Sequence, residues 1–520
     1  MAWSGLSVIY IRLQNPMKIV FVTIAVESLT IEFLSSFLKK HCHQVEIVFD
    51  PALFATEAVV SKKLAKIIDI TKEIVYQINE MQPDLIGFSV FTLNYQRSLK
   101  IAKLIKKSNP KIPIVFGGIH PTCVPERVIK EKVVDIVCIG EGEYPLLELL
   151  DSFKNNKKNF KIKNLWFKEG KRIIKNPLRP LITNLNKLPF PDKELFYKIY
   201  PGFAKDYYTT SSRGCPFSCT FCANNALKRV YRHLGQPIRQ RSPENIIEEL
   251  SLAKKKYPIK QITFVDDVFV QNVSWLKTFS QLYRQKIKLP YAMLTHPSLV
   301  TKQIALLLKK SGCYHLDFGI QSASEKTRKE ILKRFESNET ILKASQFCHQ
   351  AGLDFSIDHI FNIPSEGPPQ YLEALKFYNR LRPSVINSYW LQYFPKTEIV
   401  KIAIKKGILK KSIIPKIEKG LTGSSLVVGI GGKDSINPNL AYTNYQLLFM
   451  LTPILPKKLM DKIIKKNLLL AFRPPMIFNI ILKFFINLKI KRGDIYLGII
   501  KSTFFFMQQN LKLKWRYRRC

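Results

Sequence analysis

Continuous apolar runs alternate with helix-like segments along the first part of the chain. Helical spacing of apolar residues marks residues 30–41 and 95–108, and the apolar runs cover 18–22, 44–50, 84–91, 112–118 and 133–140. Strands that are apolar on both faces and alternate with helices predict a parallel sheet covered on both sides. We therefore expect a Rossmann-like α/β domain over residues 17–150, with its ligand beyond the carboxyl ends of the strands.

Small and polar residues follow three of these runs. The run ends read SVFT (89–92), GGIHPT (117–122) and GEGE (140–143). Glycines there either let a ligand approach the backbone closely or merely close tight turns. Because no glycine-rich fingerprint opens the first helix, the pattern gives little support to a dinucleotide site.

The alternation of strands and helices restarts at residue 206. Strand-like runs separated by helix-like segments lie at 207–212, 261–266, 291–295, 314–319, 354–360 and 386–393. Six consecutive βα units predict a partial (β/α)6 barrel over residues 206–400, with its chemistry at the carboxyl ends of the strands. Residues 151–205 are expected to be a linker with a hairpin at 165–174. Residues 1–16 are expected to be an N-terminal extension, and the lysine-rich and aromatic-rich residues 401–520 a mostly helical region.

Net charge and cysteine content bear on the partners and the cellular location of the protein. The net charge of +43 indicates an anionic partner (nucleic acid, anionic lipid or a phosphorylated substrate) or simply a lysine-rich surface. Nine cysteines, six of them scattered, form no disulfide framework. Because no secretory signal or long apolar run is found, we expect a cytoplasmic protein. The segments 474–494 and 502–520 either lie at a membrane surface, with lysines on anionic lipid, or form a helical cap on the barrel.

Three cysteines stand close together in RGCPFSCTFC (213–222), after the first barrel strand. A structural zinc site needs four ligands, and no fourth cysteine or histidine lies at a zinc-like spacing. An iron–sulfur cubane normally takes four cysteines, so three would leave one iron open to a small molecule. The other interpretation is that these cysteines are buried and inert.

This loop resembles the cluster loop of the radical S-adenosylmethionine (radical SAM) superfamily, including the aromatic Phe221 before the last cysteine. The resemblance implies that Cys215, Cys219 and Cys222 hold a [4Fe–4S] cluster whose open iron binds S-adenosylmethionine (SAM).

Three later segments resemble the SAM-binding segments of the same superfamily. FVDDVFV (264–270) resembles the segment near the SAM amino group, so Asp266 and Asp267 either accept from it or cap the next helix. FGIQSASEKT (318–327) resembles the segment facing the ribose, which implicates Gln321 and Ser322. DHIFNIPSEGP (358–368) resembles the segment whose backbone meets adenine, with Asn362 where relatives usually have glycine.

With its front domain and the LPFPD linker (188–192), the chain resembles the cobalamin-binding radical SAM proteins over residues 17–400. The DxHxxG motif that supplies a histidine to cobalt is absent, so we expect cobalamin with no protein histidine on cobalt. The residues implied to contact the corrinoid are Ser89, Thr92, Gly117, Gly118, His120, Gly140, Glu141, Gly142 and Glu143.

The resemblance implies methylation of an unactivated carbon of a small-molecule or lipid-like substrate, with an electron donor such as flavodoxin or ferredoxin. A radical cyclisation or ring rearrangement is an alternative, as is a non-catalytic corrinoid-binding or membrane-associated scaffold. A methylthiotransferase acting on RNA would need three further front cysteines; Cys42, Cys123 and Cys138 are scattered, so we do not expect nucleic acid as a partner. No catalytic side chain beyond the cluster ligands is indicated; Tyr208, His296 and His315 either contact substrate or only pack.

Overall fold

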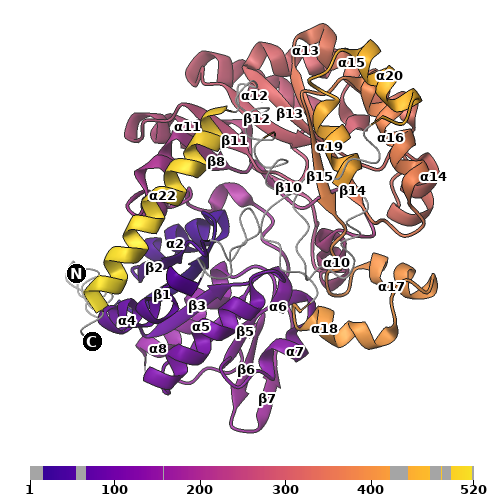
Figure 1. Cartoon of the computed structure of the whole chain (residues 1–520). Coiled ribbons are helices and arrows are strands. Elements are labelled where there is room, and N and C mark those ends of the chain that lie inside the picture. Colours follow the sequence, from indigo (N-terminus) through magenta and orange to yellow (C-terminus); the bar gives the residue numbers. More distant parts are fainter. Residues whose placement is uncertain are drawn as a thin grey trace.

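The computed structural model describes residues 16–53, 66–155, 157–421, 443–468, 482 and 493–517. The chain forms two sheets of seven and six strands with helices packed around them. Figure 1 shows the front domain (indigo to magenta) below the barrel (pink to orange), with the ends of their strands facing a shared middle region.

The front sheet has the order β2-β1-β3-β4-β5-β6-β7. Its parallel strands are β1 (Lys18–Ile24), β2 (Gln44–Asp50), β3 (Leu85–Ser89), β4 (Ile114–Gly117) and β5 (Ile136–Cys138). Strands β6 (Leu165–Glu169) and β7 (Arg172–Lys175) form the hairpin expected in the linker, and they extend this sheet in antiparallel fashion.

Alternation along each front strand builds two cores. In β1, Val20 and Val22 face one core while Ile19 and Phe21 face the other. Helices α4 (Thr71–Met81), α5 (Tyr95–Ser108) and α7 (Pro125–Ile129) cover the first face, and α2 (Leu29–Lys40) and α8 (Glu143–Lys154) cover the second. The doubly covered parallel sheet confirms the Rossmann-like expectation.

The second sheet is entirely parallel and follows chain order. Its strands are β8 (Asp206–Thr209), β11 (Gln261–Phe264), β12 (Tyr291–Thr295), β13 (Cys313–Gln321), β14 (Asp354–Phe361) and β15 (Val385–Trp390). The helices between them are α11 (Pro243–Lys256), α12 (Val273–Lys286), α13 (Lys302–Ser311), α15 (Asn338–Ala351) and α16 (Pro368–Leu381). Because β8 and β15 remain edges, this is the partial six-unit barrel expected from the sequence.

The C-terminal region is helical, as expected, but its helices divide between the two domains. Helices α19 (Thr443–Leu451) and α20 (Lys457–Lys465) bury Phe449 and Met460 in the barrel core. Helix α22 (Gly493–Arg516) instead packs on the front domain, where Phe506 joins the core that contains Phe49. Most of the segment 474–494 lies outside the described residues. Among the helices that are described, none is long and apolar enough to cross a bilayer.

Candidate functional site

The cysteine loop connects β9 (Ser212–Arg213) to α10 (Ala223–Val230). At its start, Gly214 has a φ of 92°, and a Cβ there would lie 2.0 Å from the Pro237 carbonyl oxygen, so only glycine fits. In the middle, Thr220 donates its backbone N–H to the Leu332 carbonyl at 3.1 Å and its hydroxyl to the Ile331 carbonyl at 2.7 Å. The loop is therefore fixed to the segment that follows β13.

The three thiols of this loop lie near one another. Cys219 is buried, and Cys215 and Cys222 are partly exposed. Burial raises the pKa of Cys222 to about 11, and the neighbouring Cys219 and Cys215 raise it further. Among the described residues, no three side chains converge as the ligands of one metal ion do. Burial also raises the pKa of Cys215, and the nearby Cys219 adds to this effect, so the three thiols lie close enough to affect one another. One short loop that brings three thiols together is compatible with a cubane, in which each cysteine binds a different iron.

A buried charge network lies behind Cys219. The Nη1 atom of Arg334 lies 3.8 Å from the Cys219 sulfur, and its Nε donates to Glu336 at 2.8 Å. Glu336 lies 3.4 Å from His296, whose ring stacks on Phe217 of the cysteine loop at 3.9 Å. Burial opposes ionisation of Glu336, but the hydrogen bond from His296 and the charge of Arg334 lower its pKa to about 2.

The sequence did not identify Arg334 or Glu336 as site residues. The only available signal was the pair of opposite charges in KRFES (333–337), and nothing in that pattern points toward a cysteine more than 100 positions earlier in the chain. His296 was identified, and the structure places it in packing against the cysteine loop.

The two predicted aspartates have different surroundings. Asp266 is buried and accepts the backbone N–H of Ser211 at 2.9 Å and the hydroxyls of Ser211 and Ser212. Asp267 accepts from Asn224 of α10 at 2.7 Å. Neither caps the next helix, because Asn272 caps α12; that alternative is wrong. Asp266 holds the start of the cysteine loop, and Asp267 lies beside α10.

The predicted ribose and adenine segments meet at the ends of β13 and β14. Ser322 is buried and donates its hydroxyl to Glu366. Burial raises the pKa of Glu366 to about 7. Gln321 and Asn362 both have positive φ, of 72° and 62°. A left-handed backbone at Asn362 explains why glycine suits this position and why asparagine, which tolerates that conformation, replaces it.

Phe221 is half-buried and packs against the core formed by the segments after β14 and β15. This packing anchors the end of the cysteine loop beside Cys222, and a cofactor contact of Phe221 stays a prediction. That core includes Ile363, Leu391 and Ile399.

The front-domain loops that follow β3 and β4 are tied to each other. Gly118 has a φ of 100°, and a Cβ there would come within 2.7 Å of the Val90 carbonyl oxygen. Thr122 donates to the Gly118 carbonyl at 2.7 Å and accepts from the Gly140 N–H at 2.9 Å. Ser89, Gly117 and Gly118 stay partly exposed at this edge. Small, partly exposed residues at the carboxyl ends of parallel strands fit a ligand that approaches the backbone closely, as a corrinoid would here.

His120 does not present an open nitrogen at this edge. Its ring is buried and packs on Tyr95 with centroids 4.3 Å apart, and its Nδ1 lies 3.1 Å from the Thr92 hydroxyl. Nε2 is buried without forming a regular hydrogen bond, and the backbone of Glu418 is near the ring. Burial lowers the pKa of His120 to about 4. Cobalamin bound with no protein histidine on cobalt stays a prediction.

The loop after β5 faces the barrel. Glu141 accepts from Arg213 at 2.9 Å and from Arg239 at 2.7 Å, and Glu143 accepts from Arg213 at 2.6 Å. Burial alone would raise the pKa of Glu141, but the two arginines lower it. A Cβ on Gly140 would lie 1.6 Å from the Tyr231 hydroxyl. The predicted cofactor residues at 140–143 therefore also join the two domains.

The segment after β15 contacts both predicted cofactor edges. Ile399 at the start of α17 (Glu398–Lys405) donates its N–H to the Thr220 carbonyl of the cysteine loop at 3.0 Å. Beyond α18 (Ile414–Glu418), a Cβ on Gly420 would lie 2.7 Å from the Thr92 carbonyl oxygen. Figure 1 shows α17 and α18 (orange) beside the gap between the domains.

The barrel interior is polar. Strand residues alternate between full burial under the outer helices and partial exposure on the inner face. Inner-face polar side chains hydrogen-bond between neighbouring strands: Thr263 donates to Asp206 at 2.8 Å, and Asn387 to Asp358 at 3.2 Å.

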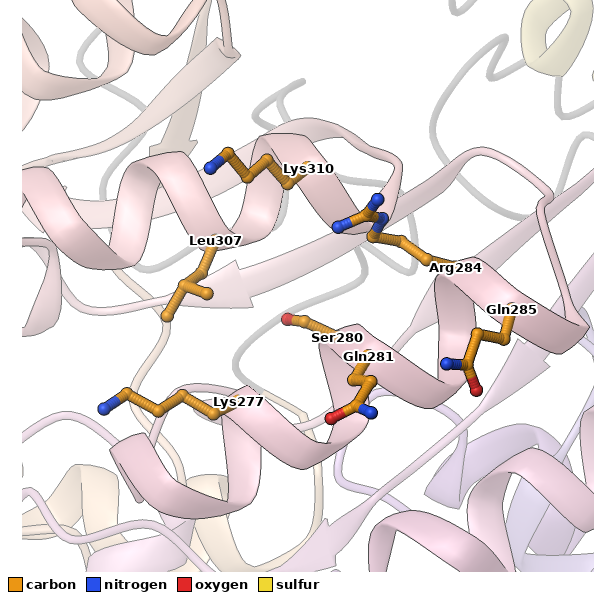
Figure 2. Close-up of a pocket in the computed structure, with 7 residues that line it drawn as sticks. All are labelled: Lys277, Ser280, Gln281, Arg284, Gln285, Leu307 and Lys310. Carbon is orange, nitrogen blue, oxygen red and sulfur yellow. The ribbon is translucent and has the colours of Figure 1, made fainter.

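Figure 2 shows a cavity of about 310 Å³ between α12 and α13, on the outer layer of the barrel. None of the predicted site residues lines it. Its lining residues are Lys277, Ser280, Gln281, Arg284, Gln285, Leu307 and Lys310.

The three front cysteines are not gathered into a second cluster site. Cys42 precedes β2 and is exposed, whereas Cys138 ends β5, which β1, β3 and β4 separate from β2, and is buried, as is Cys123. This placement gives no support to the methylthiotransferase alternative.

Two family models match the chain. The B12 binding domain matches residues 23–150, and the Radical SAM superfamily matches residues 209–378. These ranges coincide with the front sheet and with most of the barrel. The three cofactors that these domains take are cobalamin, a [4Fe–4S] cluster and SAM.

Curated relatives and a solved structure are similar to this chain. An uncharacterized methyltransferase of Pyrococcus horikoshii is 29% identical over 64% of this chain and 72% of its own length. The anaerobic magnesium-protoporphyrin IX monomethyl ester cyclase of Rubrivivax gelatinosus is 22% identical, covering 61% of this chain and 58% of its own length. The cobalamin-dependent SAM radical enzyme OxsB, solved with aqua-cobalamin and SAM, covers 98% of this chain and 80% of its own, with a TM-score of 0.64 at 17% identity.

Proposed function

Because the chain belongs to the cobalamin-binding radical SAM proteins, we propose that it methylates an unactivated carbon of a small-molecule substrate. When bound, the cluster and SAM supply a one-electron cleavage that lets hydrogen be taken from carbon, and cobalamin supplies a methyl carrier. The relative from Pyrococcus horikoshii, named as a methyltransferase, supports this choice of reaction.

One observation carries the proposal: Arg213 joins the two cofactor edges. It lies two positions before Cys215, and its guanidinium is shared between Glu141 and Glu143 at the end of β5. Cys215, Cys219 and Cys222 would hold the cluster. The loops after β3 and β4, with Ser89, Gly117 and Gly118, would bind the corrinoid. A substrate between the edges would be positioned against both cofactors. Positioning of this kind is the protein's main contribution in cofactor-dependent reactions.

The remaining predicted residues have supporting roles in this proposal. Ser322 and Gln321 would lie along the SAM ribose, with Glu366 orienting the Ser322 hydroxyl. Asp266 would hold the loop start, and Asp267 would face the amino group. The polar inner face of the barrel would accept a polar part of the substrate, even if the rest is lipid-like.

A radical cyclisation is the second candidate reaction, because the Rubrivivax gelatinosus relative is named as a cyclase. Both reactions would use the same two domains. We further propose a flavodoxin or ferredoxin as the electron donor, a cytoplasmic location, and contact of the C-terminal region with a membrane surface.

The test measures SAM products. The full chain, purified without oxygen and reconstituted with iron, sulfide and cobalamin, is incubated with SAM and a reductant. 5′-Deoxyadenosine together with S-adenosylhomocysteine supports methylation. Deoxyadenosine alone supports cyclisation or rearrangement, or uncoupled SAM cleavage in the absence of the true substrate. Neither product, with an intact cluster, would overturn both reactions in favour of a scaffold. The control replaces Cys215, Cys219 and Cys222 with alanine and should form neither product.

A further inference from the structure

One face of α22 is fixed to the front domain. The Phe506 ring packs on Phe49 with centroids 5.1 Å apart. Asn510 is buried and donates to the Ile68 carbonyl at 3.1 Å, and the Tyr517 hydroxyl donates to Glu80 of α4 at 2.7 Å. Figure 1 shows α22 (yellow) along one side of the molecule, with its C-terminal end near α4. The helix is therefore held against the front domain and forms part of its surface. It is about 36 Å long at 1.5 Å per residue.

The opposite face of α22 carries an apolar stripe. Its members follow one another at intervals of four, seven and four positions, which places them within about 60° around a helix. They are exposed by 38% to 71%, and they are Ile500, Phe504, Leu511 and Trp515. Single exposed apolar residues are ordinary on a protein surface, but four in one line mark an interaction surface.

Cations accompany the stripe, and α22 itself has no acidic residue after Asp494. Lys501 and Lys512 are exposed beside it, and neither forms an ion pair within the described part of the chain. Arg516 is exposed as well and contacts Glu80. From residue 495 to residue 517 the sequence has no aspartate or glutamate. We call these apolar residues together with Lys501 and Lys512 the α22 face.

We propose that the α22 face docks on the surface of an anionic lipid bilayer. Phenylalanine, tryptophan and leucine would enter the boundary between headgroups and acyl chains, and the two lysines would meet lipid phosphates. The helix would lie flat, since its other face is held by the front domain. A second copy of the chain is a poorer occupant, because a symmetric contact would bring the same lysines against each other. This inference is independent of the proposed reaction.

The experiment is vesicle flotation of the full chain at low and high salt. The probes are phosphatidylcholine vesicles and vesicles of phosphatidylcholine with phosphatidylglycerol. The chain should float with the anionic vesicles and dissociate as salt rises. The variant with serine at Phe504, Leu511 and Trp515 should bind at least about tenfold more weakly, and so should Lys501→Glu with Lys512→Glu.

Matched controls come from the barrel. Leu306 of α13 is exposed by 42% and Lys310 of the same helix is exposed, so Leu306→Ser with Lys310→Glu should bind like the unmodified chain. Circular dichroism checks that every variant is folded. No flotation, equal binding to neutral vesicles, or unchanged binding of the α22 variants would each overturn the proposal. So would a dimer by light scattering that the α22 variants convert to monomer without loss of any lipid binding.

Discussion

At the residue scale, Arg334 places a buried cation beside a predicted cluster ligand, with its Nη1 3.8 Å from the Cys219 sulfur. A buried positive charge stabilises the more negative, reduced form of a cluster. Arg334→Met should therefore lower the reduction potential of the reconstituted cluster, on the order of 50–100 mV for a charge at this distance in a partly dry site. An electron paramagnetic resonance titration without SAM measures the change.

The control for Arg334 is its neighbour in the chain. Lys333 pairs with Glu398 of α17 and is half-exposed, so Lys333→Met should leave the potential nearly unchanged. Equal potentials for the Arg334→Met variant and the unmodified chain would show that the arginine acts only on packing.

Glu366 gives a prediction in pH. Burial raises its pKa from the ordinary value to about 7, so between pH 4.5 and 7 the folded chain holds a proton that the unfolded chain releases. Its contribution to stability is therefore lost as pH rises through this window. Glu366→Gln keeps a neutral side chain and should raise the thermal midpoint at pH 8 but not at pH 5. The corresponding gain in the free energy of unfolding is on the order of 2 kcal/mol. Glu339→Gln, at an exposed helix position, should show no such dependence, and parallel pH profiles for the Glu366 variant would contradict the assignment.

At the element scale, the close approach of α10's C-terminal end to the loop after β5 depends on one glycine. Gly140 and Gly170 both have positive φ, but only a Cβ on Gly140 would meet a neighbour, the Tyr231 hydroxyl at 1.6 Å. Both alanine variants carry the backbone strain of about 1 kcal/mol. Gly140→Ala should cost about 1–3 kcal/mol more through overpacking. Thermal unfolding of the two variants, and relief of the Gly140→Ala effect by Tyr231→Ala, test this contact.

The elements themselves were largely predictable, because their signals are local. Apolar runs such as 84–91 and 354–360 marked strands, and the 95–108 helix has the bounds expected from apolar spacing. The domain against which α22 packs was not predictable. Its aromatic residues indicated packing, but nothing local distinguishes the front domain from the barrel as the partner.

The site residues likewise divide into those that a local sequence signal revealed and those that only the fold brings together. Cys215, Cys219 and Cys222 could be recognised because one short loop holds all three. Arg334 and Glu366 could not, since each reaches its partner only through the order of the barrel strands. The charges of Glu141 and Glu143 were visible, but their arginine partners lie 72 and 98 positions away for Glu141 and 70 for Glu143.

At the scale of the whole molecule, these carboxylates couple the two domains. Arg239 is buried and Arg213 is mostly buried, and both donate to the same Glu141 oxygen. Removing one partner of a buried pair leaves an uncompensated charge and costs about 3–5 kcal/mol. Glu141→Ala should therefore destabilise the chain by that amount, with a shift that salt changes little because the pair is shielded from solvent.

An exposed pair in the same region is the comparison for Glu141. Glu148 accepts both contacts from Arg179 and is 45% exposed, so Glu148→Ala should cost less than about 1 kcal/mol. If Glu141 holds the domains together, its variant should unfold in two separated transitions by calorimetry, the front domain and the barrel melting apart, while the Glu148 variant keeps the transition of the unmodified chain. The Glu141→Ala variant should still bind cobalamin, because its front domain stays folded. The two cofactor edges should no longer be held together, so S-adenosylhomocysteine should form more slowly while 5′-deoxyadenosine release is unchanged. A single transition and an unaltered product ratio in Glu141→Ala would mean that Tyr231 and the segment after β15 are enough to keep the edges together.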